Sequence, residues 1–198
     1  MMLMEQTQMA TAALPVAEFR DHMRLGTGFD DDGVQDGGLE TFLRAAIAAV
    51  EGRTGKVLIS RDFLYTLRAW RDLGAQVLPV APVTAINSFV IVDRTGAETT
   101  IDAAKYMLEQ DMQRPRLVST GFVLPQIPVA GEARIAFTAG FATRWSDLPA
   151  DLAQAVFLLA AHYYEHRHET AVGEALMPFG VRTLLERYRT LRLFGGRN

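Results

Sequence analysis

Residues 133 to 163 read ARIAFTAGFATRWSDLPADLAQAVFLLAAHY and contain both kinds of periodicity found along this chain. The first part, Ala133–Ala139, is rich in branched and aromatic residues and is followed by glycine, which predicts a β-strand. After Pro149 the apolar residues follow helical spacing and form a wide stripe. The stripe consists of Leu152, Ala155, Val156, Leu159, Ala160 and Tyr163. This stretch therefore passes from strand to helix, and Asp151 suits the positive N-terminal end of that helix.

The region upstream, from residue 56 to residue 139, contains a series of similar short segments separated by glycine or proline. They predict strands at Lys56–Ser60, Asp62–Trp70, Ala85–Asp93, Glu98–Ile101, Lys105–Glu109, Arg116–Ser119 and Ala133–Ala139. Prolines 79, 82, 115, 125 and 128 fall between these strands, where the missing amide hydrogen does least harm. Asp93–Gly96 has the composition of a hairpin turn. The region is predicted to be a small β-domain.

Both ends of the chain show helical spacing instead. An N-terminal helix is expected around Phe19, and a second helix over residues 39–51 is expected to end at Gly52 and Gly55. A last helix is expected over residues 178–193, with Val181, Leu184, Leu185, Tyr188 and Leu191 as its apolar positions.

The segment before the first helix, Met1 to Ala12, is predicted to be an arm that is frayed or ordered by a partner. Together the patterns predict an α+β fold, in which a helical bundle formed by both chain ends carries an inserted small antiparallel β-domain. The expected divisions are 1–55 for the arm and first helices, 56–140 for the β-domain, and 141–198 for the C-terminal helices.

Composition excludes several classes of protein. A chain of 198 residues has the size of one domain, or of one domain with an insertion. The absence of cysteine excludes disulfides, thiolate metal sites and a cysteine nucleophile, and is compatible with assembly in the bacterial cytoplasm. No apolar run is long enough for a membrane span, and the N-terminus lacks the pattern of a secretory signal. The net charge of −3 provides no general positive field for gripping DNA.

One segment resembles a catalytic motif. His162-Tyr163-Tyr164-Glu165-His166 fits the H-x-x-E-H pattern of inverted zinc peptidases, in which two histidines bind zinc and the glutamate is the base. His168 and Glu169 could supply spare ligands. The distal third ligand is missing, however, because the only other histidine, His22, lies far away on the first helix. A polar patch on the last turns of a helix is the favoured interpretation, and a zinc-dependent hydrolase remains the alternative.

The other candidate motifs do not fit a catalytic or ligand-binding pattern. The acidic run Asp30–Asp32 lacks the alternate spacing and closing glutamate of an EF-hand, so helix capping is favoured. Gly26-Thr27-Gly28 is followed by acidic residues that would repel phosphate, and no serine lies in a G-x-S-x-G elbow. We therefore expect no enzyme, cofactor or metal, but an interaction or structural protein.

Motifs spread from about Leu14 to Leu193 resemble, in their order and spacing, the head–tail connector family of long-tailed phages. The matching stretches are Leu39-x3-Leu43-x2-Ala46-x3-Val50-Glu51-x2-Thr54-Gly55, Val77-Leu78-Pro79-x2-Pro82-Val83, Ala139-Gly140-Phe141, Leu148-Pro149, Ala161-His162-Tyr163-Tyr164-Glu165-x-Arg167 and Leu184-Leu185-x2-Tyr188-Arg189. Phage-derived gene transfer agents carry similar adaptors, so the resemblance extends to their head–tail adaptor.

The resemblance implies a virion structural protein at the head–tail junction. It implies a homo-oligomeric, typically dodecameric ring that binds the portal protein on one side and a connector or tail terminator protein on the other. DNA would pass through the lumen during packaging and ejection without sequence-specific binding, and no membrane would be involved. A tail-completion protein acting elsewhere in the particle is the second alternative.

Site residues follow from this resemblance. The apolar and basic C-terminal segment is expected to dock on the portal through Leu184, Leu185, Tyr188, Leu191, Arg192, Leu193, Phe194 and Arg197. Glu165 and Arg167 are expected to form ion pairs between subunits. A ring has two different contact surfaces on each subunit, which would account for Phe63, Tyr65, Trp70 and Trp145 if these residues are exposed. A role in the core is the alternative for each of them.

Overall fold

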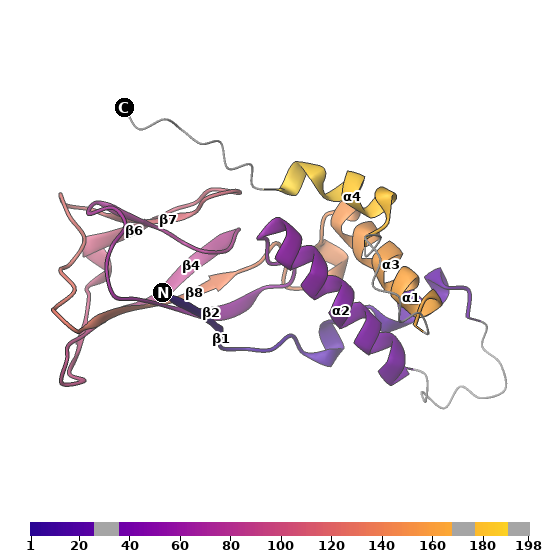
Figure 1. Ribbon diagram of the computed structural model, residues 1–198, viewed down its shortest axis with the longest axis horizontal. Coiled ribbons are helices and arrows are strands. Elements are labelled where there is room, and N and C mark those ends of the chain that lie inside the picture. The colour runs from indigo at the N-terminus through magenta and orange to yellow at the C-terminus, as the bar shows by residue number, and fades with distance from the viewer. Residues whose placement is uncertain (26–35, 168–176, 190–198) are drawn as a thin grey trace. The chain divides into compact units, whose positions relative to one another are not determined.

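The computed structural model describes residues 1–25, 36–167 and 177–189, and the chain divides into two compact units. The β unit consists of Met1–Met9 and Val57–Thr143, and the helical unit consists of Ala10–Lys56 and Arg144–Asn198. Figure 1 shows the strands of the first unit and the helices of the second. Helices and antiparallel sheets together confirm the α+β class. Within the described part of the chain, no helix is long and apolar enough to cross a membrane.

A five-stranded antiparallel sheet forms one layer of the β unit. Its order is β1 (Met2–Glu5), β2 (Arg61–Leu67), β8 (Glu132–Ala139), β4 (Val83–Val92) and β5 (Glu98–Thr100). The central strand β8 pairs with both β2 and β4 over most of its length. Its side chains alternate strictly between buried and half-buried positions, as expected for a strand with one face toward a core.

A three-stranded antiparallel sheet forms the second layer. Its order is β3 (Ala75–Val77), β7 (Arg116–Ser119) and β6 (Tyr106–Glu109), and the short helix η2 (Ala103–Lys105) precedes β6. Trp70 and Tyr106 meet the ring of Phe89 edge-on, with centroid distances of 5.8 and 5.4 Å. The core combines buried residues of both sheets, among them Phe63, Tyr65, Phe89, Leu117, Ile135 and Phe137. Burial of this apolar area is the main stabilising contribution to the unit.

Gly140, which directly follows β8, packs closely against a neighbouring segment of backbone. Its φ is 151°, and a Cβ at this position would lie 2.4 Å from the Cα of Ser60. The close approach lets Gly140 N donate to Pro82 O at 3.0 Å and Phe141 N donate to Leu58 O at 3.1 Å. Only glycine fits here without moving backbone atoms.

The helical unit contains α1 (Val16–His22), α2 (Asp36–Thr54), α3 (Ala150–Glu165) and α4 (Phe179–Leu185), with short 3-10 turns at η1 (Thr11–Ala13), η3 (Trp145–Asp147) and η4 (Glu186–Tyr188). Helix α2 packs against α1 and α3, and α3 also packs against α4. The apolar stripe predicted for α3 is largely confirmed, because five of its six members are buried and Tyr163 is half-buried. Gly55 ends α2 with a φ of 68°, whereas Gly52 lies inside the helix.

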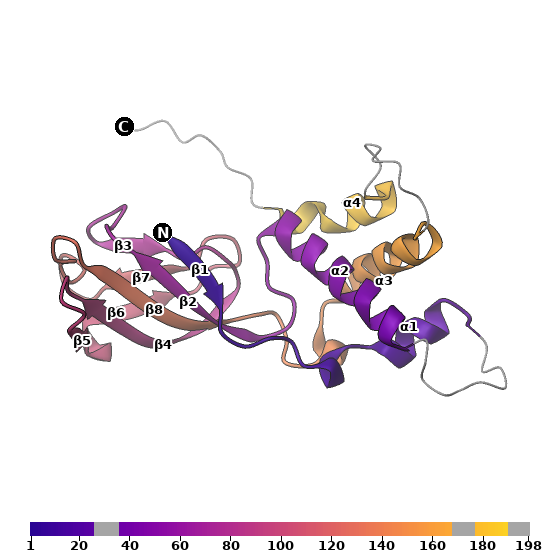
Figure 2. The same cartoon turned by 60° about the horizontal axis from the view of Figure 1, so that its bottom comes forward.

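Several predicted elements differ from the structure. Residues 2–5 are not a frayed arm: Figure 2 shows them as strand β1 beside β2, with Leu3 opposite Tyr65, so residues 1–9 belong to the β unit. Lys56–Ser60 forms no strand, although Ile59 makes an isolated bridge with Ala142 and Val57 N donates to Ala81 O at 2.8 Å. The short strand β3 was not predicted. The last helix ends at Leu185 with a 3-10 turn to Tyr188, and its predicted end at residues 190–193 lies outside the described residues.

Candidate interaction surfaces

The H-x-x-E-H segment forms the C-terminal end of α3. The imidazole rings of His162 and His166 are tilted by 41° with centroids 4.2 Å apart, and Nδ1 of His166 lies 2.9 Å from the carbonyl oxygen of His162. Arg167 donates from Nη1 to the carbonyl oxygen of Tyr164 at 2.8 Å, and its guanidinium lies 4.6 Å from the centroid of that tyrosine ring. The carbonyl oxygen of His162 also accepts from His166 N at 3.0 Å, and Arg167 supplies a donor to the Tyr164 carbonyl at the helix end, where backbone donors run out. The segment therefore caps its own helix.

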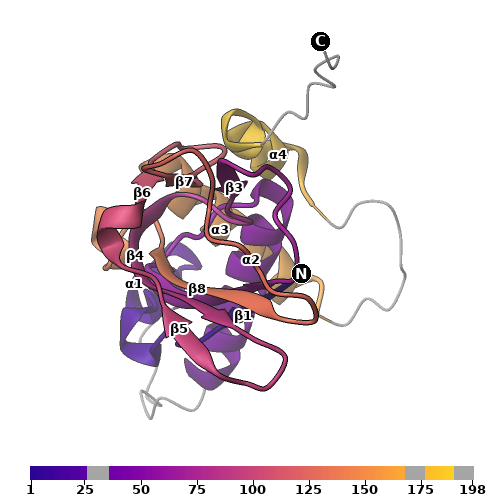
Figure 3. The same ribbon diagram turned by 90° about the vertical axis from the view of Figure 1, so that its left-hand side faces the viewer.

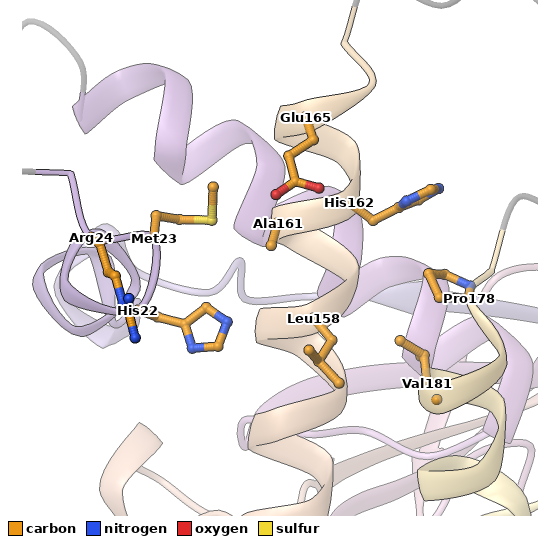
Figure 4. Close-up of a pocket in the computed structure, with 10 residues that line it drawn as sticks. His22, Met23, Arg24, Leu158, Ala161, His162, Glu165, Pro178 and Val181 are labelled. Carbon is orange, nitrogen blue, oxygen red and sulfur yellow. The ribbon is translucent and has the colours of Figure 1, made fainter.

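The helical unit has an open pocket of about 470 Å³ beside this segment. It is lined by His22, Met23, Arg24, Leu158, Ala161, His162, Glu165, Pro178, Gly180 and Val181. His22 therefore lines the same pocket as His162 and Glu165, although the sequence placed it far away. Figure 4 shows the two rings directed differently: that of His162 extends toward Pro178, and that of His22 lies on the other side of α3 near Leu158. Among residues 1–25, 36–167 and 177–189, no three histidine or acidic side chains gather as a zinc site requires.

Asp151 in the first turn of α3 holds the C-terminal part of the helical unit. Its Oδ1 accepts a hydrogen bond from the hydroxyl of Tyr188 at 2.7 Å, and its Oδ2 lies 3.2 Å from Nε of Arg187. Burial raises the pKa of the Tyr188 phenol, and the hydrogen bond to Asp151 raises it further. Leu185 and Val181 are fully buried beside it. The turn that follows α4 is thus fixed to α3 through one carboxylate.

The residues expected to dock on the portal are in different places. Leu185 and Tyr188 are buried in the helical unit, and Leu184 is half-buried. Leu191, Arg192, Leu193, Phe194 and Arg197 lie outside the described residues, as do His168, Glu169, residues 26–28 and Asp30–Asp32. Of the pair expected to form ion pairs between subunits, both Glu165 and Arg167 are exposed.

The aromatic residues considered for ring contacts are mostly not available at the surface. Phe63 and Tyr65 are buried, because β2 alternates and places its odd-numbered residues toward the core. Trp145 is half-buried and stacks on Phe157 with a centroid distance of 5.3 Å. Trp70 is half-buried and donates from Nε1 to Pro125 O at 2.8 Å. These residues hold their own units together.

Several exposed apolar side chains instead lie on loops of the β unit, and Phe179 at the start of α4 is exposed as well. Outside the strands and the N-terminal segment, the most exposed large apolar residues of this unit are Leu73, Phe122, Val123 and Val129, together with Met112 in the turn between β6 and β7. These residues are not among the predicted site residues, since loops were given no role. A signal was present in Ser119-Thr120-Gly121-Phe122-Val123, where two large apolar residues follow a polar turn.

No family model and no curated protein matches this chain. Solved structures do match it, and each similarity covers all of both chains. One is a chain of the neck of an empty gene transfer agent particle computed with C6 symmetry, with 57% identity and a TM-score of 0.91. Another comes from the virion of a native gene transfer agent particle, with 56% identity and a TM-score of 0.88. A third comes from the neck of a native particle computed with C12 symmetry, with 52% identity and a TM-score of 0.86.

The similarity agrees with the geometry of the chain. Polar groups in the H-x-x-E-H segment cap a helix, the described residues hold no cluster of metal ligands, and apolar side chains are exposed on loops. Exposed apolar side chains of this kind are a feature of proteins that bind other proteins. Because identity above half extends over the full length of both chains, this chain belongs to the neck proteins of gene transfer agent particles and is of the head–tail adaptor type.

Proposed function

We propose that this chain forms a homo-oligomeric ring between the portal and the tail of a gene transfer agent particle, with DNA passing through the lumen. The observation that carries the proposal is the full-length similarity to chains in necks computed with C6 and C12 symmetry. Both symmetries are compatible with a dodecamer, since a twelvefold ring also obeys sixfold symmetry. A connector or tail terminator protein would bind the tail side of the ring.

The charge of the chain supports a lumen that DNA can pass through. A net charge of −3 gives no general attraction for the phosphate backbone. Many arginines of the described residues are also paired with carboxylates, as in Arg116 with Glu109 at 2.7 Å and Arg134 with Glu98 at 2.8 Å. Paired cations leave less positive potential for holding DNA in place. We therefore propose passage without sequence-specific binding.

Portal docking is proposed for the C-terminal segment. The helices from both chain ends would form a bundle that presents this segment, with Leu185 and Tyr188 anchoring it from inside. Leu184, Leu191, Leu193 and Phe194 would then contact the portal, with Arg192 and Arg197 at the rim of the contact. Large apolar residues flanked by arginine have the composition of an interface hot spot.

A smaller contribution is proposed for Glu165 and Arg167. Both are exposed at the end of α3, and the contacts of Arg167 with Tyr164 hold its guanidinium in a defined position. A neighbouring subunit could pair with either charge. Exposed pairs of this kind contribute about 0–1 kcal/mol each, so they would set orientation more than affinity.

Electron microscopy of the purified protein with and without its portal tests the proposal. We expect free protein that is monomeric by light scattering, since ring formation must offset the loss of rigid-body freedom, and rings only where the portal acts as a template. Particles made without this chain should be filled heads that lack tails. A stable twofold-symmetric dimer, or normal tailed particles without the chain, would contradict the proposal.

A further inference from the structure

The apolar loops of the β unit form two separate exposed surfaces at one end of that unit. Leu67 lies opposite Ala133 and Val92 lies opposite Glu132, so the loops that follow β2 and β4 and the loop that precedes β8 are at the same end. Figure 3 views the β unit from this end, with β3 and the β4–β5 hairpin on different sides. Strand β3 is the edge of one sheet and β5 the edge of the other.

The first surface, called the loop surface, consists of Leu73, Phe122 and Val123. Their exposed fractions are 69%, 100% and 57%. Hydrogen bonds hold them in place, because Leu124 N donates to Leu73 O at 2.7 Å and the Ser119 hydroxyl donates to Val123 O at 2.8 Å. A fixed loop loses little conformational freedom on binding, which favours its use as an anchor.

Cations outnumber carboxylates around the loop surface. Arg68 and Arg71 are exposed in the segment that leads to Leu73. Lys105 is exposed as well, and its carbonyl oxygen accepts a hydrogen bond from Thr120 N at 3.2 Å, which places it beside the Phe122 loop. Two carboxylates lie there, Asp72, which accepts from Gly74 N at 2.8 Å, and Asp102, which accepts from Ala104 N at 2.8 Å, against these three cations. The apolar centre therefore has a predominantly basic rim.

The second surface, called the turn surface, lies around the β4–β5 hairpin and consists of Val129, Asp93, Glu98 and Glu132. Val129 is 92% exposed, and its loop is closed by a hydrogen bond from Gly131 N to Pro128 O at 2.9 Å. Gly131 approaches Val92 O so closely that a Cβ would lie 2.5 Å from that oxygen, which places the loop beside the end of β4.

Carboxylates outnumber cations on the turn surface. Asp93 accepts hydrogen bonds from Thr95 N, the Thr95 hydroxyl and Ala97 N, and these bonds hold the pKa of its carboxyl below the usual range. Glu98 and Glu132 share one cation, Arg134, with nitrogen–oxygen distances of 2.8 Å each. With the exposed Arg94, two arginines face three carboxylates.

We propose that the loop surface of one copy of this chain docks on the turn surface of the next copy in the ring. The inference rests on the proposed ring. A cyclic ring has heterologous contacts, so each subunit must present two different and complementary surfaces. The two surfaces each have an exposed apolar centre, carry opposite excess charge and lie at different edges of the same unit. An apolar centre with a polar rim is also the usual composition of a protein–protein interface.

The absence of cysteine from the chain allows a direct test by crosslinking. A variant with Val123→Cys and Val129→Cys is assembled on the portal, treated with a short bismaleimide and resolved by denaturing electrophoresis. We expect a ladder of covalent oligomers that extends to the full ring. The matched control combines Val123→Cys with Met112→Cys. Met112 is also exposed, but it lies in the turn between β6 and β7, at the other end of these strands from Ser119. The control should give no ladder.

A second variant tests the energetic contribution of the anchor. Phe122→Ser should weaken ring assembly on the portal at least tenfold, as expected for an aromatic hot spot. Its unfolding temperature should not change, since the side chain is fully exposed. Met112→Ser serves as the control and should assemble normally.

The outcomes separate this inference from the proposed function. If the wild-type chain forms no ring on the portal, the proposed function fails and this inference fails with it. If the wild-type chain forms rings but the Val123/Val129 pair gives no more ladder than its control, only the docking inference is overturned. Normal assembly of the Phe122→Ser variant would overturn it as well, and would favour contact of the loop surface with a different neck protein or with none.

Discussion

Replacing Tyr188 with phenylalanine tests whether the contact with Asp151 fixes the end of the helical unit. Helix α4 has only seven residues, and a helix of that length is not stable alone in water. Its position depends on the buried side chains of Val181 and Leu185 and on the hydrogen bond from Tyr188 to Asp151. The substitution removes the hydroxyl and keeps the ring, so the apolar contacts remain.

The structure allows the size of the effect to be estimated. A hydrogen bond to a charged acceptor contributes about 1.5–3 kcal/mol. Asp151 keeps two other partners in the variant, namely Leu152 N at 3.0 Å and the exposed Arg187, so its carboxylate is not left unsatisfied. We therefore expect a loss of about 1–1.5 kcal/mol, below or at the lower end of that range. This loss corresponds to a roughly five- to tenfold increase in the equilibrium constant for local opening of the segment.

Hydrogen exchange measured by mass spectrometry provides the assay. Peptides that cover residues 179–189 should exchange roughly five- to tenfold faster in Tyr188→Phe, because local unfolding of this segment becomes easier. Peptides that cover β8 should not change. Tyr164→Phe is the control, since the ring of Tyr164 packs on Phe42 and the described residues offer its hydroxyl no hydrogen bond. Unchanged exchange over 179–189, or equal acceleration in both units, would refute the reasoning.

Four further outcomes are expected. Deleting Leu193–Asn198 should leave the unfolding temperature unchanged but yield filled heads without tails; normal particle yield would move the portal contact elsewhere. Purified protein should contain no stoichiometric metal and keep its unfolding temperature in chelator; near-stoichiometric zinc by elemental analysis would revive a role for His162 and His166. Gly140→Ala should cost at least about 2 kcal/mol in urea denaturation, whereas Gly52→Ala, in an open helical position, should stabilise by about 0.5–1 kcal/mol. Burial raises the pKa of four tyrosine phenols above their ordinary value of 10.0. Their contribution to the free energy of unfolding is therefore present below pH 10 and is lost as pH rises through the pKa values of the folded protein. Absorbance titration combined with thermal unfolding can follow this loss. These four are Tyr65, Tyr106, Tyr163 and Tyr188.

Elements with strong periodicity could be predicted from the sequence. Strand β8 and helix α3 were placed closely, because each has a one-sided apolar pattern over its whole length. The hairpin turn at Asp93–Gly96 was also predicted, and its carboxylate bonds explain why aspartate suits the first position. Strand β1 could not be predicted, since Met2–Glu5 contains no β-branched residue and is a strand only because β2 pairs with it from 60 residues away.

Local sequence patterns do not show which side chains reach the surface or which ones meet in space. The aromatic residues Phe63 and Tyr65 were weighed as surface contacts, but the register of β2 against β8 turns both to the core. His22 was judged distant from His162, yet helix packing brings both to one pocket. Phe122 is fully exposed on a loop that is fixed by hydrogen bonds donated to Leu73 O and Gly74 O by Leu124 N and Ser119 N. Long-range pairing decides each of these cases.

The order of segments along the chain has a consequence for synthesis on the ribosome. Strand β1 emerges before its partner β2, which follows only after residues 10–56 of the other unit. The central strand β8 emerges later still, so the sheet cannot close until residue 139 has left the exit tunnel. At synthesis rates of about 5–20 residues per second, β1 therefore stays unpaired for several seconds. Its methionine-rich edge is a ready target for chaperones during that interval, and a chain released early would have neither unit complete.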